Sequence, residues 1–272
     1  MGSKSAAATA RPPPPSTSPR LRVLCLHGWR TSGQILSTQT AAMRAHTDME
    51  LVFITAPHAA VGEPDPGIAM FYPDEPYFEW FLRSPPASAE DEDEEARANP
   101  QASASLYTGL DESIEAIIEA LRTRGPFDGV LGFSQGAGMV TRLAYIQQQQ
   151  QQQQQEQKDS TPVALVAATD TYHPRRFPST SGLFRFAILI GGVPPQELES
   201  SSASSEAGPV APLALPSLHI HGLADPYLEL SQRLLDMYAQ TGRALLQHEE
   251  GHNIPSIRTN LYAKINAWLA AQ

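Results

Sequence analysis

A pentapeptide in the middle of the chain, Gly132-Phe133-Ser134-Gln135-Gly136, restricts the possible folds more than any other feature. A short apolar run precedes it and a helix-like segment follows it, so the pattern lies in a strand-to-helix context. A serine at the tip of such a turn brings the strand and the helix so close that a Cβ two residues on either side would clash. Glycine at positions 132 and 136 removes this clash. The stretch therefore predicts a G-x-S-x-G nucleophile elbow, which gains weight only if an acid and a histidine follow in the right order.

The composition is typical of one large domain. The chain has 272 residues, of which 41% are hydrophobic, enough for a buried core. Its net charge is −10, and the run at 90–95 (EDEDEE) supplies six of these charges. A basic patch that would bind nucleic acid is lacking, and no apolar run approaches the ~18 residues that span a bilayer. We therefore expect neither a nucleic-acid partner nor a membrane span.

The cysteine content and the N-terminal arm bear on the compartment. The single cysteine, Cys25, excludes an internal disulfide and indicates a reducing, cytoplasmic setting. Residues 1–20 contain no acid and loosely resemble an organelle transit peptide, but Pro12 to Pro15 oppose the amphipathic helix of a mitochondrial signal. We expect a disordered arm at 1–20, and organelle targeting stays open as the alternative.

Apolar runs that read as strands alternate with helical patterns along 21–272. Alternation of this kind predicts βα units, and hence a mostly parallel sheet of about six strands with helices on both faces. The predicted strands are 21–27, 49–55, the apolar run that enters the elbow, 186–192, 217–222 and 244–249. The predicted helices are 34–47, 106–124, the segment from Gln135 to Ile146, 227–241 and 257–269.

Three low-complexity inserts interrupt this pattern, near 84–104, 147–160 and 199–212. The glutamine run from Gln147 to Gln155 either prolongs the preceding helix or forms a disordered insert. Prolines and aromatic residues share the segment 59–83, which we read as an ordered loop beside the active site or, equally, as a satellite core. The stretch from 161 to 182 gives no clear pattern beyond a short apolar run at 163–168.

The residues downstream of Ser134 supply an acid and a histidine in the order Ser, Asp, His. Asp225 follows the next-to-last predicted strand, and His252 follows the last one. Because loops after parallel strands gather at the carboxyl edge of a sheet, these three residues can converge. A catalytic triad depends on these residue types, because the imidazole takes the proton of the serine, a weak nucleophile, and the carboxylate orients the imidazole.

An oxyanion formed by serine attack needs two backbone N–H donors. Gln135, at the helix start after the nucleophile, is one candidate. The loop after the first strand supplies the other, with Trp29 as our first choice and Arg30 as the second.

The remaining histidines compete for these roles. His219 and His221 lie within a predicted strand and are read as packing or hydrogen-bonded histidines, while His248, in the last predicted strand, is read as structural or solvated. His27 is expected to order the oxyanion loop, and His58 stays open between a substrate contact and a structural role.

Taken together, several motifs resemble the FSH family of serine hydrolases. They are LRVLCLHG at 21–28, TAPH at 55–58, FEWF at 78–81, GFSQGA at 132–137, HIHG-x-x-DP at 219–226 and EGH at 250–252. The resemblance covers the chain, with gaps, from about Leu21 to Leu269. It implies an α/β-hydrolase fold, with Ser134, Asp225 and His252 as the triad. The family includes ovarian-cancer-associated-gene-2-type hydrolases and fungal thioesterases that release polyketides.

We therefore expect a serine hydrolase that cleaves carboxylic esters through an acyl-enzyme, without metal or cofactor. The expected pocket is lined by the 161–185 loop and by His58, Trp29, Phe71, Tyr72 and Trp80, which suggests an apolar acyl chain. One alternative is a thioesterase that unloads an acyl carrier protein; another is a binding module that has kept the fold without catalysis.

Overall fold

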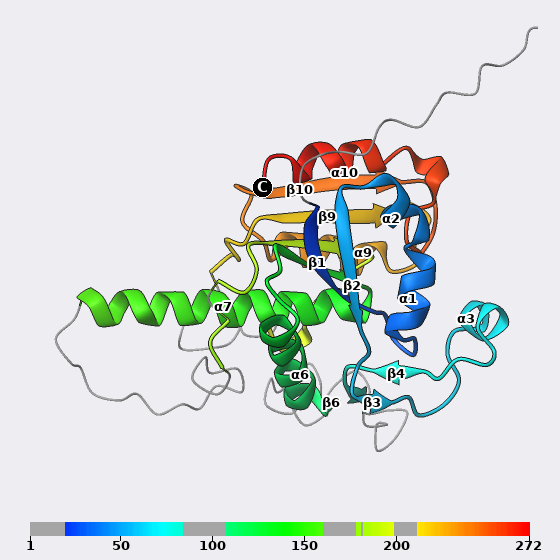
Figure 1. Ribbon diagram of the computed structural model, residues 1–272, viewed down its shortest axis with the longest axis horizontal. Coiled ribbons are helices and arrows are strands. Elements are labelled where there is room, and N and C mark those ends of the chain that lie inside the picture. The colour runs from blue at the N-terminus through cyan, green and yellow to red at the C-terminus, as the bar shows by residue number, and fades with distance from the viewer. Residues whose placement is uncertain (1–19, 84–106, 160–177, 181, 199–210) are drawn as a thin grey trace, which may run out of the picture.

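A six-stranded sheet forms the centre of the computed structural model, which describes residues 20–83, 107–159, 178–180, 182–198 and 211–272. The strand order is β10-β9-β8-β7-β1-β2, and all neighbouring strands are parallel (Figure 1). The strands are β1 (Leu21–Leu26), β2 (Met49–Ile54), β7 (Gly129–Phe133), β8 (Phe186–Ile190), β9 (Ser217–Gly222) and β10 (Arg243–His248). The predicted mostly parallel sheet of about six strands is confirmed.

Strand β1 shows why this sheet needs a layer on each side. Its side chains alternate between two hydrophobic clusters: Leu24 and Leu26 belong to one, and Val23 and Cys25 belong to the other. All four are fully buried. A strand buried on both faces reads in sequence as a continuous apolar run, as expected for the interior of a parallel sheet.

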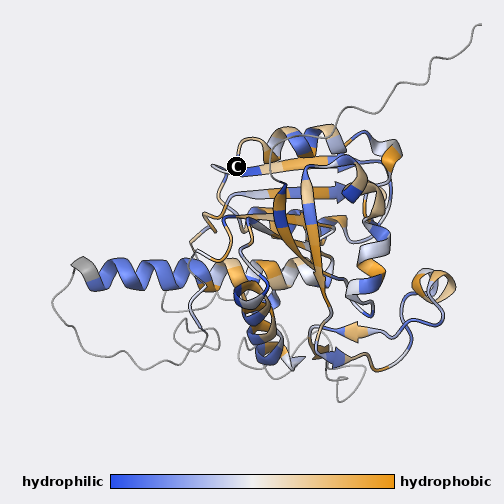
Figure 2. Cartoon of the chain, in the orientation of Figure 1, coloured by the Kyte–Doolittle hydropathy of each residue, from blue (hydrophilic) through white to orange (hydrophobic). Residues whose placement is uncertain are grey.

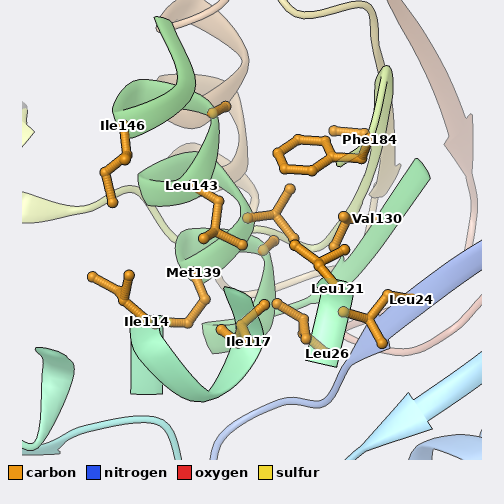
Figure 3. Close-up of a cluster of buried hydrophobic side chains, with 14 of the residues drawn as sticks. Leu24, Leu26, Ile114, Ile117, Leu121, Val130, Met139, Leu143, Ile146 and Phe184 are labelled. Carbon is orange, nitrogen blue, oxygen red and sulfur yellow. The ribbon is translucent and has the colours of Figure 1, made fainter. Parts of the chain in front are cut away.

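One face of the sheet packs against α6 (Leu110–Thr123), α7 (Gln135–Asp159) and α9 (Leu228–Asp236). Figure 3 shows side chains of this layer, in which Ile117 of α6, Met139 of α7 and Leu26 of β1 belong to one buried hydrophobic cluster. The predicted helix 106–124 begins four residues late, because Tyr107–Thr108 (β6) pairs with β5 (Leu82–Arg83) instead. A pairing of two residues is too short to leave a periodic pattern in the sequence.

The other face packs against α1 (Gly33–Gln39), α2 (Ala41–His46) and α10 (Tyr262–Leu269). The single helix expected at 34–47 is broken at Thr40, whose hydroxyl donates to the Leu36 carbonyl at 2.7 Å. Such a side-chain bond competes with the helical ladder. The helix expected at 257–269 likewise begins as a 3-10 turn, Ile257–Thr259, before α10.

The glutamine run prolongs the helix, which was one of the two possibilities left open. Helix α7 continues through it to Asp159, and its far half is hydrophilic and projects beyond the sheet (Figures 1 and 2). Gln147 and Gln150, at the near end, are buried against the body of the protein. Within the described residues, no helix has the length and apolar character to cross a membrane.

The aromatic segment after β2 contains β3 (His58–Ala59), α3 (Pro66–Phe71) and β4 (Phe78–Glu79). Strands β3 and β4 pair antiparallel outside the main sheet. The predicted apolar run at 163–168, the acidic run and the N-terminal arm lie outside the described residues.

Candidate active site

The turn between β7 and α7 has the tight geometry that its glycines imply. Ser134 sits at its tip with a backbone φ of 54°, in the left-handed region that side chains rarely adopt. A Cβ at Gly132 would lie 2.5 Å from the Ala137 backbone, and one at Gly136 would lie 2.3 Å from the Leu26 carbonyl oxygen. Neither position therefore accepts a larger residue without moving the helix away from the sheet.

Ser134, His252 and Asp225 lie within hydrogen-bond distance at the carboxyl edge of the sheet. His252 Nε2 is 2.9 Å from Ser134 Oγ, and His252 Nδ1 is 2.7 Å from Asp225 Oδ2. Asp225 follows β9 and His252 follows β10, so each loop brings one member to the elbow. Because Nδ1 faces a carboxylate, it carries the proton in the neutral ring, and Nε2 is left to accept one from the serine.

Both oxygens of the Asp225 carboxylate are held in place. One accepts from His252, and the other accepts from the Tyr227 backbone N–H at 2.7 Å. The Asp225 side chain is only 2% exposed, while the His252 side chain is 21% exposed. The rings of Phe133 and Tyr227 pack on His252, with centroids 5.0 and 5.1 Å away. The imidazole is therefore fixed in orientation yet open to a substrate.

Gly191, directly after β8, is a site residue that the sequence reasoning missed. Its φ is 53°, and a Cβ there would lie 3.1 Å from His252 Nδ1 and 3.4 Å from Asp225 Oδ2. The last residue of β8, Ile190, accepts a hydrogen bond from the Ser134 N–H at 3.0 Å. The two consecutive glycines that end the apolar run 186–192 are the feature of the sequence that could have indicated this position.

The two loops that carry the predicted oxyanion donors meet at the serine. A Cβ at Gly28 would lie 3.4 Å from Ser134 Cβ, which places the start of the loop after β1 beside Ser134. Trp29 comes next in this loop, and Gln135 is the first residue of α7. Within the described part of the chain, neither backbone N–H donates to a protein acceptor.

His27 is buried beneath this loop and orders it, as expected. Its Nδ1 lies 2.8 Å from the Gly28 carbonyl oxygen and 3.1 Å from Thr31 Oγ1, while Nε2 accepts from the Ala56 N–H at 3.0 Å. Burial lowers the pKa of His27 to about 4, although the bond to the Gly28 carbonyl opposes the shift. The ring is therefore neutral and occupied at both nitrogens.

The other three strand histidines lie inside the fold. His219 is fully buried, and its Nε2 is 3.1 Å from Ser217 Oγ. Desolvation, with the nearby His221 and Arg243 charges, lowers its pKa to about 3. His221 and His248 are also buried, and desolvation is the main cause that lowers the pKa of each. Their burial agrees with the structural reading.

The predicted pocket residues are dispersed, and one needs correction. Trp80 has no exposed surface and belongs to the main core, so it does not line an open pocket. Phe71 is 76% exposed on α3, at the margin of the molecule (Figure 1). The Tyr72 carbonyl accepts from the Tyr77 hydroxyl at the end of α3. His58 Nε2 is 2.7 Å from the Gly109 carbonyl oxygen, which gives it a structural contact. Trp29, 46% exposed, stays beside the site.

The described residues contain no group of three or more histidine, cysteine, aspartate or glutamate side chains that could hold a metal ion.

Comparison with known proteins places this geometry in context. Residues 17–263 match a family model described as serine hydrolase (FSH1). The esterase OVCA2 of Danio rerio is 33% identical over 251 residues, which cover 87% of this chain and 91% of the relative.

Two solved structures resemble the fold at low sequence identity. One is acyl-protein thioesterase 2 of Zea mays, with a TM-score of 0.50, 16% identity, and 95% and 96% of the two chains covered. The other is a carboxylesterase of Mesorhizobium loti, with a TM-score of 0.50, 17% identity, and 93% and 90% covered.

Proposed function

Because this chain belongs to the serine hydrolase (FSH1) family, we propose that Ser134, His252 and Asp225 form the catalytic triad of an esterase. The resemblance drawn from the motifs and the expected α/β-hydrolase fold are both confirmed. The observation that carries the proposal is the continuous hydrogen-bonded chain from Asp225 Oδ2 through the His252 ring to Ser134 Oγ.

The reaction starts with attack of Ser134 Oγ on the ester carbonyl carbon. His252 Nε2 takes the serine proton as the new C–O bond forms, and Asp225 stabilises the resulting imidazolium. The tetrahedral intermediate then collapses, and its C–O bond to the alcohol breaks as His252 returns the proton to the leaving oxygen. Water repeats the sequence on the acyl-enzyme, which releases the acid and restores Ser134.

The oxyanion of each tetrahedral intermediate needs donors that are in place before the reaction. The Gln135 N–H, at the start of α7, is one proposed donor, and it also benefits from the positive end of the helix dipole. The Trp29 N–H is the other. That neither amide donates to another acceptor in the described residues supports this assignment.

Exposed apolar side chains beside the triad favour an apolar acyl or alcohol group. Tyr227 packs on His252 and is 50% exposed, while Trp29 and Leu223 are 46% and 43% exposed. Burial of such surface by a substrate would contribute about 25 cal/mol per Å². A thioester on a carrier protein presents the same carbonyl to the same triad, so the substrate test includes one.

A Ser134→Ala variant tests the triad. We expect kcat for a p-nitrophenyl ester to fall at least about 10⁴-fold, with complete loss of labelling by a fluorophosphonate probe. Ser37→Ala is the matched control, since Ser37 is a half-buried serine on α1. Equal activity in the Ser134→Ala variant and the wild type would refute the proposal.

Substrate profiling tests the finer assignment. We expect kcat/KM to rise with acyl chain length for free esters, and variants that trim Tyr227 or Leu223 to lose long-chain activity more than short-chain activity. Equal losses for both chain lengths would contradict an apolar acyl site. A carrier-bound thioester cleaved much faster than the free ester of the same acid would favour the thioesterase instead.

A further inference from the structure

We propose that Arg30 is a positioning residue, whose side chain, paired with Glu79, holds the Trp29 amide in place as an oxyanion donor. The inference rests on the proposed function. It concerns the Arg30 side chain, whose hydrogen bonds go to Glu79, Glu63 and Val61 and not to the triad.

The backbone conformation of Arg30 is unfavourable unless surrounding contacts stabilise it. Arg30 has a φ of 48°, one of only three non-glycine residues with positive φ in the described part of the chain. A conformation of this kind costs free energy for a residue with a side chain, and it persists only where surrounding contacts enforce it. Because Arg30 directly follows Trp29, its conformation sets the course of the loop that carries the proposed donor.

The Arg30 side chain supplies these contacts in four directions. Its Nε donates to Glu79 Oε1 at 2.9 Å, and its two terminal nitrogens donate to the carbonyl oxygens of Glu63 and Val61. Its guanidinium also stacks on the Trp29 ring, with Cζ 4.2 Å from the ring centroid. A planar fork with five donors can do this at once, whereas the point charge of a lysine cannot.

Glu79 is the anchor of this arrangement. Its side chain is 5% exposed, and its carboxylate pairs with Arg30, whose side chain is 22% exposed. A buried carboxylate needs a partner, and the loss of that partner is far more costly than the pair is favourable. Arg30 is therefore held at the end of β4, which does not belong to the main sheet.

The residues on either side of Glu79 contact both loops of the proposed oxyanion hole. The Phe78 N–H donates to the Thr31 carbonyl at 2.8 Å, and the Trp80 indole N–H donates to the His27 carbonyl at 2.8 Å. The Trp80 backbone N–H donates to the Gln135 side-chain oxygen at 3.1 Å. The segment 78–80 thus joins the loop after β1 to the elbow, and it fixes the spacing of the two proposed donors.

Displacement of one donor should act on the transition state more than on substrate binding. The charge that the two N–H groups stabilise develops only as the tetrahedral intermediate forms. Of the apolar side chains proposed to bind the ester, Tyr227 and Leu223 belong to the segment after β9 and not to the loop that carries Arg30. Loss of the Arg30 side chain should therefore lower kcat and leave KM nearly unchanged.

The experiment compares Arg30→Ala, Arg30→Lys and Glu79→Gln with Arg22→Ala. Arg22 is a close match, because it donates to one carboxylate, that of Glu50, and to the carbonyl oxygens of Arg124 and Pro126. It lies near the opposite end of β1, away from the triad. All variants are titrated for active sites, and their kcat, KM, thermal midpoint and affinity for an alkyl boronic acid are measured. The boronic acid forms a tetrahedral adduct on the serine.

We expect Arg30→Ala to lower kcat about 10- to 100-fold with less than a threefold change in KM, since removal of a whole oxyanion donor costs about 10²- to 10³-fold. Boronic acid affinity should fall in proportion to kcat/KM. Glu79→Gln should reproduce the direction of the effect, Arg30→Lys should restore only part of the rate, and Arg22→Ala should keep the wild-type kcat.

A kcat for Arg30→Ala equal to that of Arg22→Ala would overturn the inference, as would proportional changes in kcat and KM that follow the thermal midpoint. If Arg30→Ala does not fold, wild-type kcat in both Arg30→Lys and Glu79→Gln would do the same. Failure of the proposed function would look different, because Ser134→Ala would then remain active.

Discussion

Gly191 leaves room for the imidazole of His252 because it has no side chain. It lies at the end of the strand beside the elbow, where a Cβ would lie 3.1 Å from the His252 ring and 3.4 Å from Asp225 Oδ2. Any larger residue must displace the His252 ring by a few tenths of an ångström. Catalytic geometry tolerates little displacement, because proton transfer depends on heavy-atom distances of about 2.6–3.2 Å.

We expect Gly191→Ala to lower kcat about tenfold or more, since its Cβ would lie 3.1 Å from His252 Nδ1 and Cε1. The control is Gly182→Ala: Gly182 also has a positive φ, of 75°, but a Cβ there meets nothing within 4 Å. Both variants therefore share the conformational cost in stability, and only Gly191→Ala disturbs the site. Steady-state kinetics and thermal melts of the pair separate the two effects. Equal kcat values would show that the His252–Asp225 pair adapts.

The sequence located the three members of the proposed triad but not the residues that hold them. Ser134, Asp225 and His252 follow predicted strands, and the topology of a parallel sheet brings such positions to one edge. The role of Gly191 cannot be predicted from the sequence, because a glycine after a strand is common in any α/β protein. The prediction that Trp80 lines the pocket is wrong for a related reason. An aromatic residue in a proline-rich segment carries no periodic signal that tells whether it faces the core or a pocket.

Helix α7 consists of an apolar first part and a glutamine-rich second part. Its first turns are apolar and pack against the sheet, with Met139 and Leu143 in the main core (Figure 3). Its second half is a glutamine run, yet the first residues of that run dock. Gln150 accepts from the Thr180 N–H at 2.8 Å and donates to the Pro178 carbonyl. Composition could not distinguish docked glutamines from solvated ones, because the docking partner is far away in sequence.

Removal of the Gln150 amide should destabilise the fold. Thr180 is fully buried, so Gln150→Ala would leave its N–H without this acceptor, a penalty of about 1–3 kcal/mol. Gln152→Ala is the matched control, since Gln152 lies on the same helix and is exposed. Urea denaturation measures the difference in the free energy of unfolding. A loss below about 0.5 kcal/mol, the range of ordinary surface substitutions, would contradict the docking role.

The molecule as a whole has an interior rich in neutral histidine. His27, His219, His221 and His248 are all buried, and desolvation is the first cause that lowers the pKa of each. In the unfolded chain each would titrate near its ordinary value of about 6.5. The stability that these rings contribute is therefore fully present above pH 6.5, where both states are neutral.

Below pH 6.5 these histidines bind protons in the unfolded chain but not in the folded protein. The free energy of unfolding therefore falls as the pH falls toward the folded pKa values. These are about 4 for His27 and about 3 for His219. At 1.36 kcal/mol per pH unit, each of these two rings should remove roughly 2 kcal/mol of stability between pH 6.5 and 5. Urea denaturation at pH 7 and pH 5 measures the total loss.

The variant His219→Gln isolates one contribution to this loss. The substitution removes a titrating group, so the difference in unfolding free energy between pH 7 and pH 5 should shrink by roughly 2 kcal/mol. Its packing against Tyr238, with ring centroids 5.0 Å apart, will also be lost, but that cost is the same at both pH values and cancels in the difference. An unchanged difference would mean that His219 takes up its proton in the folded state as readily as in the unfolded one. The loss of stability between pH 7 and pH 5 would then have to arise from the other buried rings, His27, His221 and His248, whose pKa values are also lowered by desolvation.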